Sequence, residues 1–441
     1  MKKLVIFMLM MLMMAFAEPV TITWFVGLGT GGAPEQQEMQ NSVIERFNAS
    51  QDDINLEVIY VQNEVSVETL STLIATGQAP DIIGPVGFAG SNAFKGNFLD
   101  IAPYVESSGY DLSQFPEAAV DFQRTEDGLL GLPLANFPAF LYYRPDLFDE
   151  AGLEYPPAAY GEPYVLDGEE VEWNMDTLRD VSMILTVDGN GNDATMADFD
   201  PENIVQWGFA NQWAGNMRQN VTLFGAGNLI DDEGNAYMSD AWREGWHWFY
   251  NAIWQDHFIP NSAQEGSDLL AAGNPFSSGN VAMAQSHLWY TCCLEDSDWD
   301  AAALPSYNGV VTARLHADTF RIMKSTAHPE EAFSVLAYLT GEASLDLLSV
   351  YGGMPARLAT KISSLPDLMK KYSQGVNWQV AKDSLNYPDI PSHEAWLPNN
   401  NKVNDRIDGF RSLMQSEPGL DVDAEIDILL ADLQLLFDEV R

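Results

Sequence analysis

The sequence has little positive charge. Lys and Arg number 21 against 64 Asp and Glu, which gives a formal net charge of −43. Such a charge repels nucleic acid and anionic membrane surfaces, and it keeps copies of the chain apart. We therefore expect a monomer without a nucleic-acid partner. The favoured interpretation is a solvated acidic surface adapted to salt, where counterions screen the repulsion; an acidic functional patch is the alternative.

Cysteine is also scarce. The two cysteines, Cys292 and Cys293, are adjacent in the stretch HLWYTCCLED. Adjacent thiols without a third cysteine are poor ligands for tetrahedral zinc. Neighbouring Cα atoms lie about 3.8 Å apart, closer than the roughly 4.4–6.8 Å usual in disulfides, so a bond between the two would be strained. The pair is either two small buried thiols or a strained vicinal ring exposed at a ligand site.

Signatures of catalysis are missing. None of the six histidines stands in an H-x-x-x-H pattern, and there is no G-x-S-x-G elbow. Carboxylates are so abundant that a glycosidase pair stays open by counting, but nothing singles out two of them. We therefore expect no catalytic residues and a protein that is not an enzyme.

Only one long apolar run occurs, Leu4 to Met14, behind Lys2 and Lys3. It is too short to span a bilayer comfortably, and Ala15-Phe16-Ala17 offers the small residues that signal peptidase reads. We predict that residues 1–17 are a signal peptide; a buried N-terminal helix is the alternative. No cysteine follows the run, so no lipid anchor is expected. Its removal brings the charge to −45, and we expect a soluble periplasmic or extracellular protein.

The length of 441 residues, with 46% hydrophobic residues and 12 Trp, predicts two or three globular domains. In the first part of the chain, predicted strands and helices alternate, which is typical of a parallel sheet covered by helices. We expect strands at 20–26, 54–60 and 81–84, and helices at 35–48 and from a cap at Ser66 to Gly77. Further helices are expected at 240–257, at 328–339 and over a terminal stripe at 422–440.

Gly27-Leu-Gly29-Thr-Gly31-Gly32 matches the dinucleotide pattern G-x-G-x-x-G between a strand and a helix. No acidic residue ends the second strand, where Tyr60 and Val61 stand, and nicotinamide cofactors are scarce outside the cell. We interpret the glycines as letting backbone amides approach a ligand, which makes Gly29 a candidate binding residue. An exported dehydrogenase is the alternative.

Asp188-x-Asn190-x-Asn192 resembles the start of a calcium loop, with Asp198 close behind. Alternating Asp and Asn oxygens suit a hard cation. The sixth position is Asp193 in place of Gly, and the twelfth is not Glu, so the helix-loop-helix form is not supported. An irregular structural calcium site at these four residues or a plain Asn/Gly turn both remain open. No other cofactor is expected.

Five stretches together resemble the extracellular solute-binding proteins of ABC importers, specifically the sugar-binding family that includes maltose-binding protein. The likeness covers nearly the whole mature chain in the family's order, with Arg144-Pro145 in place of the usual Asn-Lys. The stretches are ATGQAPDII (75–83), LPLANFPAFLYYRPDLFDEAGL (132–153), SGNVAMAQSHLW (278–289), HPEEAFSVLAYLTGE (328–342) and YGGMPAR (351–357).

The resemblance implies an α/β fold of two lobes joined by a hinge, with a ligand cleft between them. The implied boundaries are 18–138 plus 306–352 for one lobe and 139–305 plus 353–441 for the other. The lobes would close over the ligand by hinge bending.

The resemblance also implies the binding residues. Trp289 matches the family's sugar-stacking Trp, Trp396 its late cleft aromatic and, more weakly, Trp213 another. Indole rings suit the apolar C–H faces of sugars. The further candidates are Tyr290 beside Trp289, Asp81 and Phe88 around the third strand, and Tyr351 and Arg357 at the GGMP loop.

The function implied is capture of a sugar or short oligosaccharide and its delivery to the permease subunits of an ABC importer in the membrane. A secreted glycoside hydrolase is the alternative from another class. A polyol or another small solute could replace the sugar.

Overall fold

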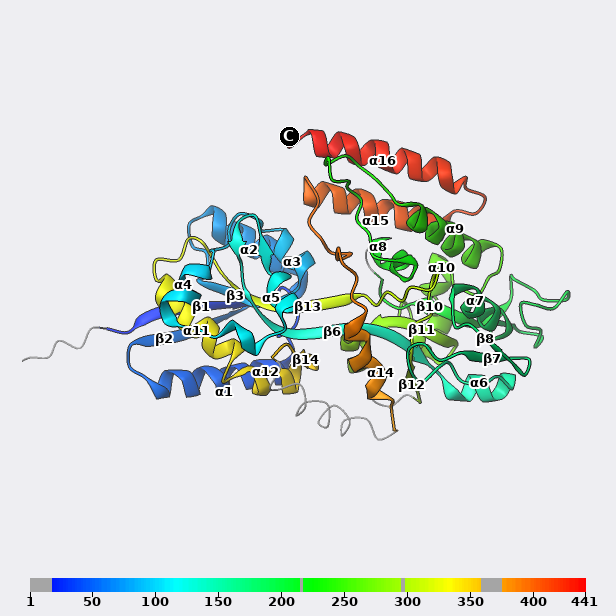
Figure 1. The fold of residues 1–441 in the computed structure, drawn as a ribbon, viewed down its shortest axis with the longest axis horizontal. Coiled ribbons are helices and arrows are strands. Elements are labelled where there is room, and N and C mark those ends of the chain that lie inside the picture. The colour runs from blue at the N-terminus through cyan, green and yellow to red at the C-terminus, as the bar shows by residue number, and fades with distance from the viewer. Residues whose placement is uncertain (1–17, 215–216, 295–297, 358–374) are drawn as a thin grey trace, which may run out of the picture.

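The computed structural model describes residues 18–214, 217–294, 298–357 and 375–441; the predicted signal peptide lies outside them. The described chain forms two bodies, lobe 1 and lobe 2, which strands β6 and β13 join (Figure 1). The strands of the main sheet run in the order β2-β1-β3-β13-β6-β11-β10-β9, and β12 and β14 also pair with β6.

Lobe 1 begins as the sequence predicts. β1 (Val20–Val26) pairs in parallel with β2 (Ile54–Tyr60) and β3 (Ile82–Val86), and α1 (Pro34–Ser50) connects the first two strands. The predicted cap at Ser66 is wrong, because α2 (Asn63–Ala75) starts earlier and the Ser66 hydroxyl donates to the Asn63 carbonyl. The other helices of this lobe are α3 (Phe88–Asn92), α4 (Ala102–Ser108), α5 (Glu117–Asp121), α11 (Pro329–Thr340) and α12 (Ser344–Tyr351).

Strand β6 (Leu132–Tyr143) runs through both lobes and is buried along its whole length. Its first part pairs with β13 (Leu315–Ile322) and β14 (Met354–Pro355), which belong to lobe 1. From Ala139 onward it pairs with β11 (Val281–His287) and β12 (Asp300–Ala302) of lobe 2. The change of partners in mid-strand places the hinge in a continuous, hydrogen-bonded backbone.

Lobe 2 continues the sheet with β10 (Ile204–Asn211), parallel to β11, and β9 (Val187–Asp188) at the edge. Helix α9 (Asp240–Trp254) packs its apolar face against α16 (Val422–Asp438) and α15 (Asn400–Ser416). The helices α6 (Pro145–Ala151), α7 (Met175–Ile184), α8 (Met217–Val221), α10 (Ser262–Glu265) and α14 (Trp378–Asp383) complete it. Short hairpins form from β4 (Arg124–Thr125) with β5 (Gly128–Leu129) in lobe 1, and from β7 (Tyr164–Leu166) with β8 (Glu169–Val171) in lobe 2.

Two crossings differ from the predicted lobe boundaries. Residues 306–314 still pack in lobe 2, where Tyr307 contacts Phe224, so the chain re-enters lobe 1 only with β13. It also stays in lobe 1 past residue 352, because β14 pairs with Asn136 and Ala135 of β6. The crossings thus follow strand pairing, which sequence likeness locates only approximately.

Within the described residues, no single helix is long and apolar enough to cross a membrane. The pair α11 and α12, bent by 59°, meets that test jointly by length and composition. Both helices are largely buried in the core of lobe 1.

Candidate functional site

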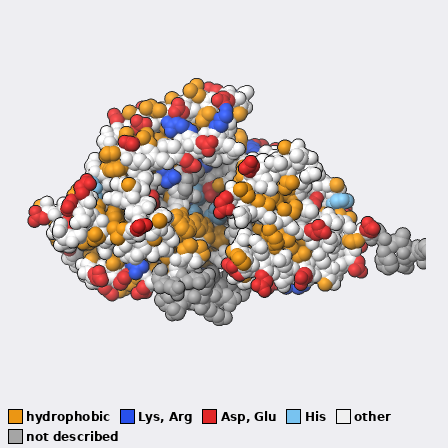
Figure 2. Space-filling model, turned by 180° about the vertical axis from the view of Figure 1, so that it is seen from behind, with side chains coloured by type: hydrophobic (Ala, Val, Ile, Leu, Met, Phe, Trp, Pro, Cys, Tyr) orange, Lys and Arg blue, Asp and Glu red, His pale blue; other side chains and the backbone are white. Residues whose placement is uncertain are grey.

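The two lobes enclose a hollow whose wall carries gathered hydrophobic side chains (Figure 2). We call it the inter-lobe hollow. β6 and β13 pass between the lobes, and the chain from α14 to α15 runs through the middle of the molecule (Figure 1). This last segment, residues 384–399, touches both lobes: Asn92 of lobe 1 donates to the Glu394 carbonyl at 2.7 Å, and Arg218 of lobe 2 donates to the Ala395 carbonyl at 2.9 Å.

Three rings form a stack where β11 ends, which we call the aromatic ladder: His287, Trp289 and Trp213. The His287 and Trp289 centroids lie 5.5 Å apart with planes at 24°, and Trp289 and Trp213 lie 6.0 Å apart at 13°. The buried end is His287, whereas Trp213 is 43% exposed. The ladder therefore leads from the hinge to the surface as a graded aromatic wall.

The local fold holds the outer ring of the ladder firmly. Trp213 has a positive φ of 50°, which is rare for a bulky side chain. Its indole Nε1 donates to the Gly273 carbonyl at 2.9 Å, and its ring meets Tyr290 edge-on at 5.1 Å. A strained backbone under an exposed indole is typical of a functional position.

Behind the ladder lies a set of buried ionisable groups from β13 and the 384–399 segment, which we call the hinge cluster. His316 stands between two carboxylates, with Nε2 3.0 Å from Asp318 and Nδ1 3.3 Å from Glu394. Burial opposes the charge of His316, but these two neighbours outweigh it and hold its pKa well above the usual value. The remaining members are His393 and Asp389, whose side chains lie 2.6 Å apart.

The ionised groups at the hinge carry opposite charges that compensate one another. Burial alone would raise the pKa of Glu394, but the charge of His316 lowers it to about 2. Two buried arginines, Arg218 and Arg314, act on Glu394 and Asp389, and burial lowers the pKa of each arginine to about 10. Burial, and then Arg314, keep the pKa of His287 well below its usual value, so this ring is neutral at pH 7.

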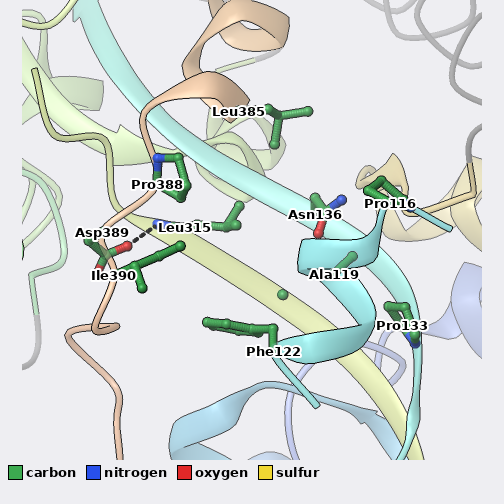
Figure 3. Close-up of a pocket in the computed structure, with 11 residues that line it drawn as sticks. Pro116, Ala119, Phe122, Pro133, Asn136, Leu315, Leu385, Pro388, Asp389 and Ile390 are labelled. Carbon is green, nitrogen blue, oxygen red and sulfur yellow. Dashed lines mark hydrogen bonds between the residues drawn. The ribbon is translucent and has the colours of Figure 1, made fainter. Parts of the chain in front are cut away.

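A small apolar pocket of about 120 Å³ lies at the hinge between the lobes (Figure 3). Phe122 and Ala119 face it from lobe 1, and Pro388 and Ile390 from the 384–399 segment, across β6 and β13. It is smaller than the roughly 300–1,000 Å³ of ordinary ligand sites. We therefore place the candidate site at the aromatic ladder.

Comparison with known families agrees with this geometry. Residues 32–345 match the family model described as bacterial extracellular solute-binding protein. The chain belongs to this family. The resemblance on which the sequence analysis relied is thereby confirmed, as is the two-lobe α/β fold.

Solved structures of solute-binding proteins share the fold over nearly the whole chain. The sugar-binding protein MalE from Xanthomonas citri superimposes with a TM-score of 0.72 at 17% identity, covering 95% of this chain and 98% of that one. The ABC substrate-binding protein Lmo0181 from Listeria monocytogenes, in complex with cycloalternan, gives 0.70 at 18% identity, covering 96% and 98%. At such identities the likeness establishes the fold.

A curated relative is similar in part of the sequence. The sn-glycerol-3-phosphate-binding periplasmic protein UgpB from Brucella abortus is 32% identical over 160 residues. The match covers 34% of this solute-binding protein and 35% of UgpB, so the chain matches about a third of the length of its curated relatives.

The predicted aromatic residues occupy different positions in this solute-binding protein. Trp289 and Trp213 stack on each other in the ladder, as described. Trp396 stands apart from them on the 384–399 segment, where the Lys95 ammonium of lobe 1 lies 3.6 Å from its ring centroid. Tyr290 is fully buried and donates to Asn274 Oδ1 at 2.6 Å, so it supports the ladder from behind and does not line the hollow.

Two predicted lobe 1 residues lie at the carboxyl edge of the parallel strands, where α/β sheets bind ligands. The exposed Gly29 follows β1, and the half-buried Phe88 follows β3, with its ring 4.2 Å from Phe122 of the hinge pocket. The amides of Gly31 and Ala33 at the start of α1 are already taken by Gln36 Oε1. This capping leaves little there for a cofactor phosphate to bind.

The structure does not bring the other lobe 1 candidates to the hollow. Asp81 lies at the opposite, amino edge of β3, where its carboxylate accepts from Thr23 and Thr326. Tyr351 is buried against α1 and accepts from Gln40 at 2.8 Å. Arg357 donates to the Tyr110 hydroxyl at 3.0 Å and covers the ring of Phe115. These three side chains stabilise lobe 1.

The predicted calcium loop is organised by hydrogen bonds. The buried Asp188 carboxylate accepts from the Asn190, Asn192 and Asp200 amides and from the Asn192 side chain. Asn192 also donates to the Asp198 carbonyl at 3.0 Å. In the described part of the chain, no three His, Cys, Asp or Glu side chains are grouped as a metal site would need. A calcium site at Asp188, Asn190, Asn192 and Asp198 stays a prediction, which calcium titration calorimetry tests.

The adjacent cysteines follow the ladder on the same short helical segment, Leu288–Cys293. Their sulfur atoms lie 3.1 Å apart, farther than the about 2.05 Å of a disulfide bond, with Cys292 exposed and Cys293 half-buried. The sequence leaves open two separate thiols or a vicinal disulfide ring. Thiol counting on unfolded protein decides between these two forms.

Sequence reasoning missed the hinge cluster and Lys95. His316, His393 and Glu394 lie far apart from His287 in the chain and follow no metal or catalytic spacing. The one available signal was local: His393 and Glu394 stand beside the predicted Trp396, and His287 stands two residues before Trp289. Strands β11 and β13 bring them together only in the fold.

Proposed function

We propose that this chain captures a neutral carbohydrate in the inter-lobe hollow and delivers it to the permease subunits of an ABC importer. The observation that carries the proposal is the near-parallel, partly exposed pair Trp213 and Trp289, which stacks on the buried His287 at the hinge. Indole faces bind the apolar faces of sugar rings, and hydroxyl groups find partners in the polar groups around them. The structural neighbour Lmo0181 was solved in complex with cycloalternan.

The charges near the ladder favour a neutral ligand. Arg218 and Arg314 are 2% and 1% exposed, and they donate to carbonyls at the hinge, including Ala395 and Gln285. The cation closest to the predicted aromatics, Lys95, is paired with Glu126 at 2.7 Å. A phosphate monoester binds best to exposed donors such as unpaired arginine forks, which these residues do not supply.

A second candidate ligand is an anionic polyol ester. The UgpB-like third of the sequence supports it, since that relative binds sn-glycerol 3-phosphate. The two candidates make opposite demands on charge, so one experiment separates them.

The test is a thermal-shift screen of the mature chain, residues 18–441. The panel holds glucose, galactose, sucrose, trehalose, maltose, maltotriose and raffinose, with glycerol 3-phosphate and inorganic phosphate beside them. A ligand that binds only the folded state raises the melting temperature. A shift with a neutral sugar supports the proposal, whereas a shift with glycerol 3-phosphate alone overturns it in favour of the second candidate.

We infer further that the chain binds without turnover, is exported with removal of residues 1–17, and acts as a monomer. Glu394, with a pKa of about 2, has no proton to donate to a glycosidic oxygen at neutral pH. The large negative charge of the chain opposes self-association. Chromatography of each sugar after long incubation tests turnover, and a hydrolysed product would restore the glycoside hydrolase alternative.

A further inference from the structure

Arg321 of β13 is a buried arginine in lobe 1, and only 4% of it is exposed. Burial lowers its pKa to about 10, and no carboxylate among the described residues opposes this shift. The equally buried Arg218 and Arg314 differ, because the charges of Glu394 and Asp389 act on both of them. A buried charge without an acidic partner destabilises a fold. Arg321 therefore lacks a counterion that its counterparts at the hinge possess.

Two aromatic rings lie against the guanidinium group of Arg321. Its Cζ atom is 5.0 Å from the ring centroid of Phe98 and 5.7 Å from that of Phe88. A ring face attracts a cation, so the two rings offset part of the charge. They offer no lone pairs to the N–H groups that point outward in the plane of the guanidinium. These donors still need acceptors of another kind.

The same place holds two buried donors without acceptors. Arg321 Nη2 donates to Gln123 Oε1 at 3.2 Å, which joins β13 to the turn between α5 and β4. Gln123 is 1% exposed. Arg321 Nε and Gln123 Nε2 are both buried, and neither has a hydrogen-bond partner in the part of the chain that the structure describes. Unmet buried donors are costly unless an acceptor from outside the protein satisfies them.

A water molecule meets these demands only in part. It would accept from both donors, but its own hydrogen atoms would then need acceptors, and it would leave the charge of Arg321 unbalanced. An anion only accepts hydrogen bonds, and it neutralises the guanidinium group as well. The covering rings and the burial of both polar side chains favour a small ion over a bulky one.

We propose that Arg321 and Gln123 form a binding site for a halide ion such as chloride, which accepts from Arg321 Nε and Gln123 Nε2. The ion would connect β13 with the end of α5 and, through the ring of Phe88, with α3. Phe88 also contacts Phe122 of the hinge pocket, with 4.2 Å between the ring centroids. The site therefore stabilises the part of lobe 1 next to the hinge. This inference does not depend on which ligand the inter-lobe hollow binds.

Scanning calorimetry of the mature chain tests the site in sodium chloride and in sodium methanesulfonate at the same ionic strength. Methanesulfonate has the same charge as chloride and is bulkier. We expect the wild-type melting temperature to be higher by about 3 °C or more in chloride, because an ion that binds only the folded state stabilises it. Arg321→Met should lose this gain. The matched control is Arg124→Met, at an exposed arginine of lobe 1 that pairs with Asp121, and it should keep the gain.

A second measurement needs no variant and decides the case if Arg321→Met does not fold. Wild-type crystals are soaked in sodium bromide, and anomalous scattering locates the bromide ions. We expect a peak at hydrogen-bonding distance from Arg321 Nε.

Three outcomes overturn the inference. The first is a site that holds only water, and the second is a chloride gain that Arg321→Met retains. The third is a bromide peak without any chloride gain in wild type, which means binding at crystal concentration only. None of these outcomes bears on the carbohydrate function.

Discussion

Among single residues, Trp289 is the one on which the proposed binding role of the aromatic ladder depends most. Its ring lies between His287, which is buried at the hinge, and Trp213, which reaches solvent. The backbone before it is fixed, because the Tyr142 hydroxyl donates to the His287 carbonyl at 2.9 Å. Trp289 therefore offers a ring that loses little conformational freedom on binding.

Removal of this ring tests the ladder. We expect Trp289→Ala to weaken binding of the best carbohydrate at least tenfold, which corresponds to about 1.4 kcal/mol, because the exposed Trp213 ring loses the indole on which it stacks. Titration calorimetry measures the affinity. Tyr237→Ala is the control, since Tyr237 is 49% exposed elsewhere on lobe 2 and should bind as wild type does. Equal affinity in Trp289→Ala and wild type would refute the stacking role.

His316 makes folding stability depend on pH. Its folded-state pKa lies above the unfolded value of about 6.5, so its stabilisation is complete below that pH and is lost as the pH rises toward the folded-state value. Glu394 has the opposite dependence on pH, because its folded-state pKa of about 2 lies below its usual value. Its contribution to folding stability is therefore lost only in acid, as the pH falls toward about 2. Asp318 and Glu394 contact the ring. His393 and Asp389 complete the cluster, and the buried Arg218 and Arg314 act on Glu394 and Asp389.

We expect His316→Gln to flatten the fall in stability as the pH rises above about 6.5, because the titrating group is gone. Urea unfolding at several pH values measures the slope for wild type and the variant. The control is His328→Gln, at an exposed position before α11. An unchanged slope in His316→Gln would mean that the hinge ring does not hold its proton.

Sequence reasoning reached single residues unevenly. It singled out Trp289 because the likeness to the family fixes a spacing along one strand, and the binding role of this residue stays a prediction. It put Tyr290 beside Trp289, and the structure buries the Tyr290 ring behind the ladder, in the short helical segment that follows β11. It set Asp81 beside the ligand, although the amino edge of β3 directs that carboxylate toward Thr23 and Thr326.

Among the structural elements, β6 and β13 connect the two lobes and determine how the hinge can bend. Each belongs to both lobes or passes between them, and Ala139 of β6 donates to the Arg314 carbonyl where they meet. Strands that keep their hydrogen bonds at a hinge permit bending but resist sliding. The helices, by contrast, belong to single lobes and stabilise each one separately.

Lobe 2 depends on the packing of α15 against α9. Phe410 is fully buried and meets Trp246 edge-on at 5.0 Å. We expect Phe410→Ala to destabilise the protein by about 3–5 kcal/mol, as measured by urea unfolding. Leu435→Ala on α16, at a side chain 67% exposed, is the control and should change stability by less than about 0.5 kcal/mol. A similar small loss in Phe410→Ala would show that lobe 2 is packed differently.

Elements were more predictable than sites. The alternation of apolar and polar residues predicted the bounds of β1 and β2 to the residue. The predicted bounds of α9, α11 and α16 were right to within a few residues. The hinge crossings were not predictable in this way. Which strand crosses, and where β6 changes partners, depends on pairing between distant segments, and periodicity within one segment carries no information about that.

At the scale of the whole molecule, charge opposes compactness. With 64 acids against 21 Lys and Arg, self-repulsion destabilises the folded chain at low ionic strength. We expect the melting temperature to rise as sodium chloride increases from about 0.01 to 1 M, since the Debye length falls from roughly 30 to 3 Å. Differential scanning calorimetry measures it. A melting temperature that does not change with salt would contradict the idea of adaptation to salt.

We have proposed that two hinged lobes hold a neutral carbohydrate against the aromatic ladder of His287, Trp289 and Trp213. A crystal structure of the mature chain with the best sugar from the screen tests this most directly. We predict electron density for a sugar ring between the lobes, packed against the exposed indole of Trp213, the outer ring of the aromatic ladder. Density elsewhere, or a hollow without sugar at saturating concentration, would contradict it.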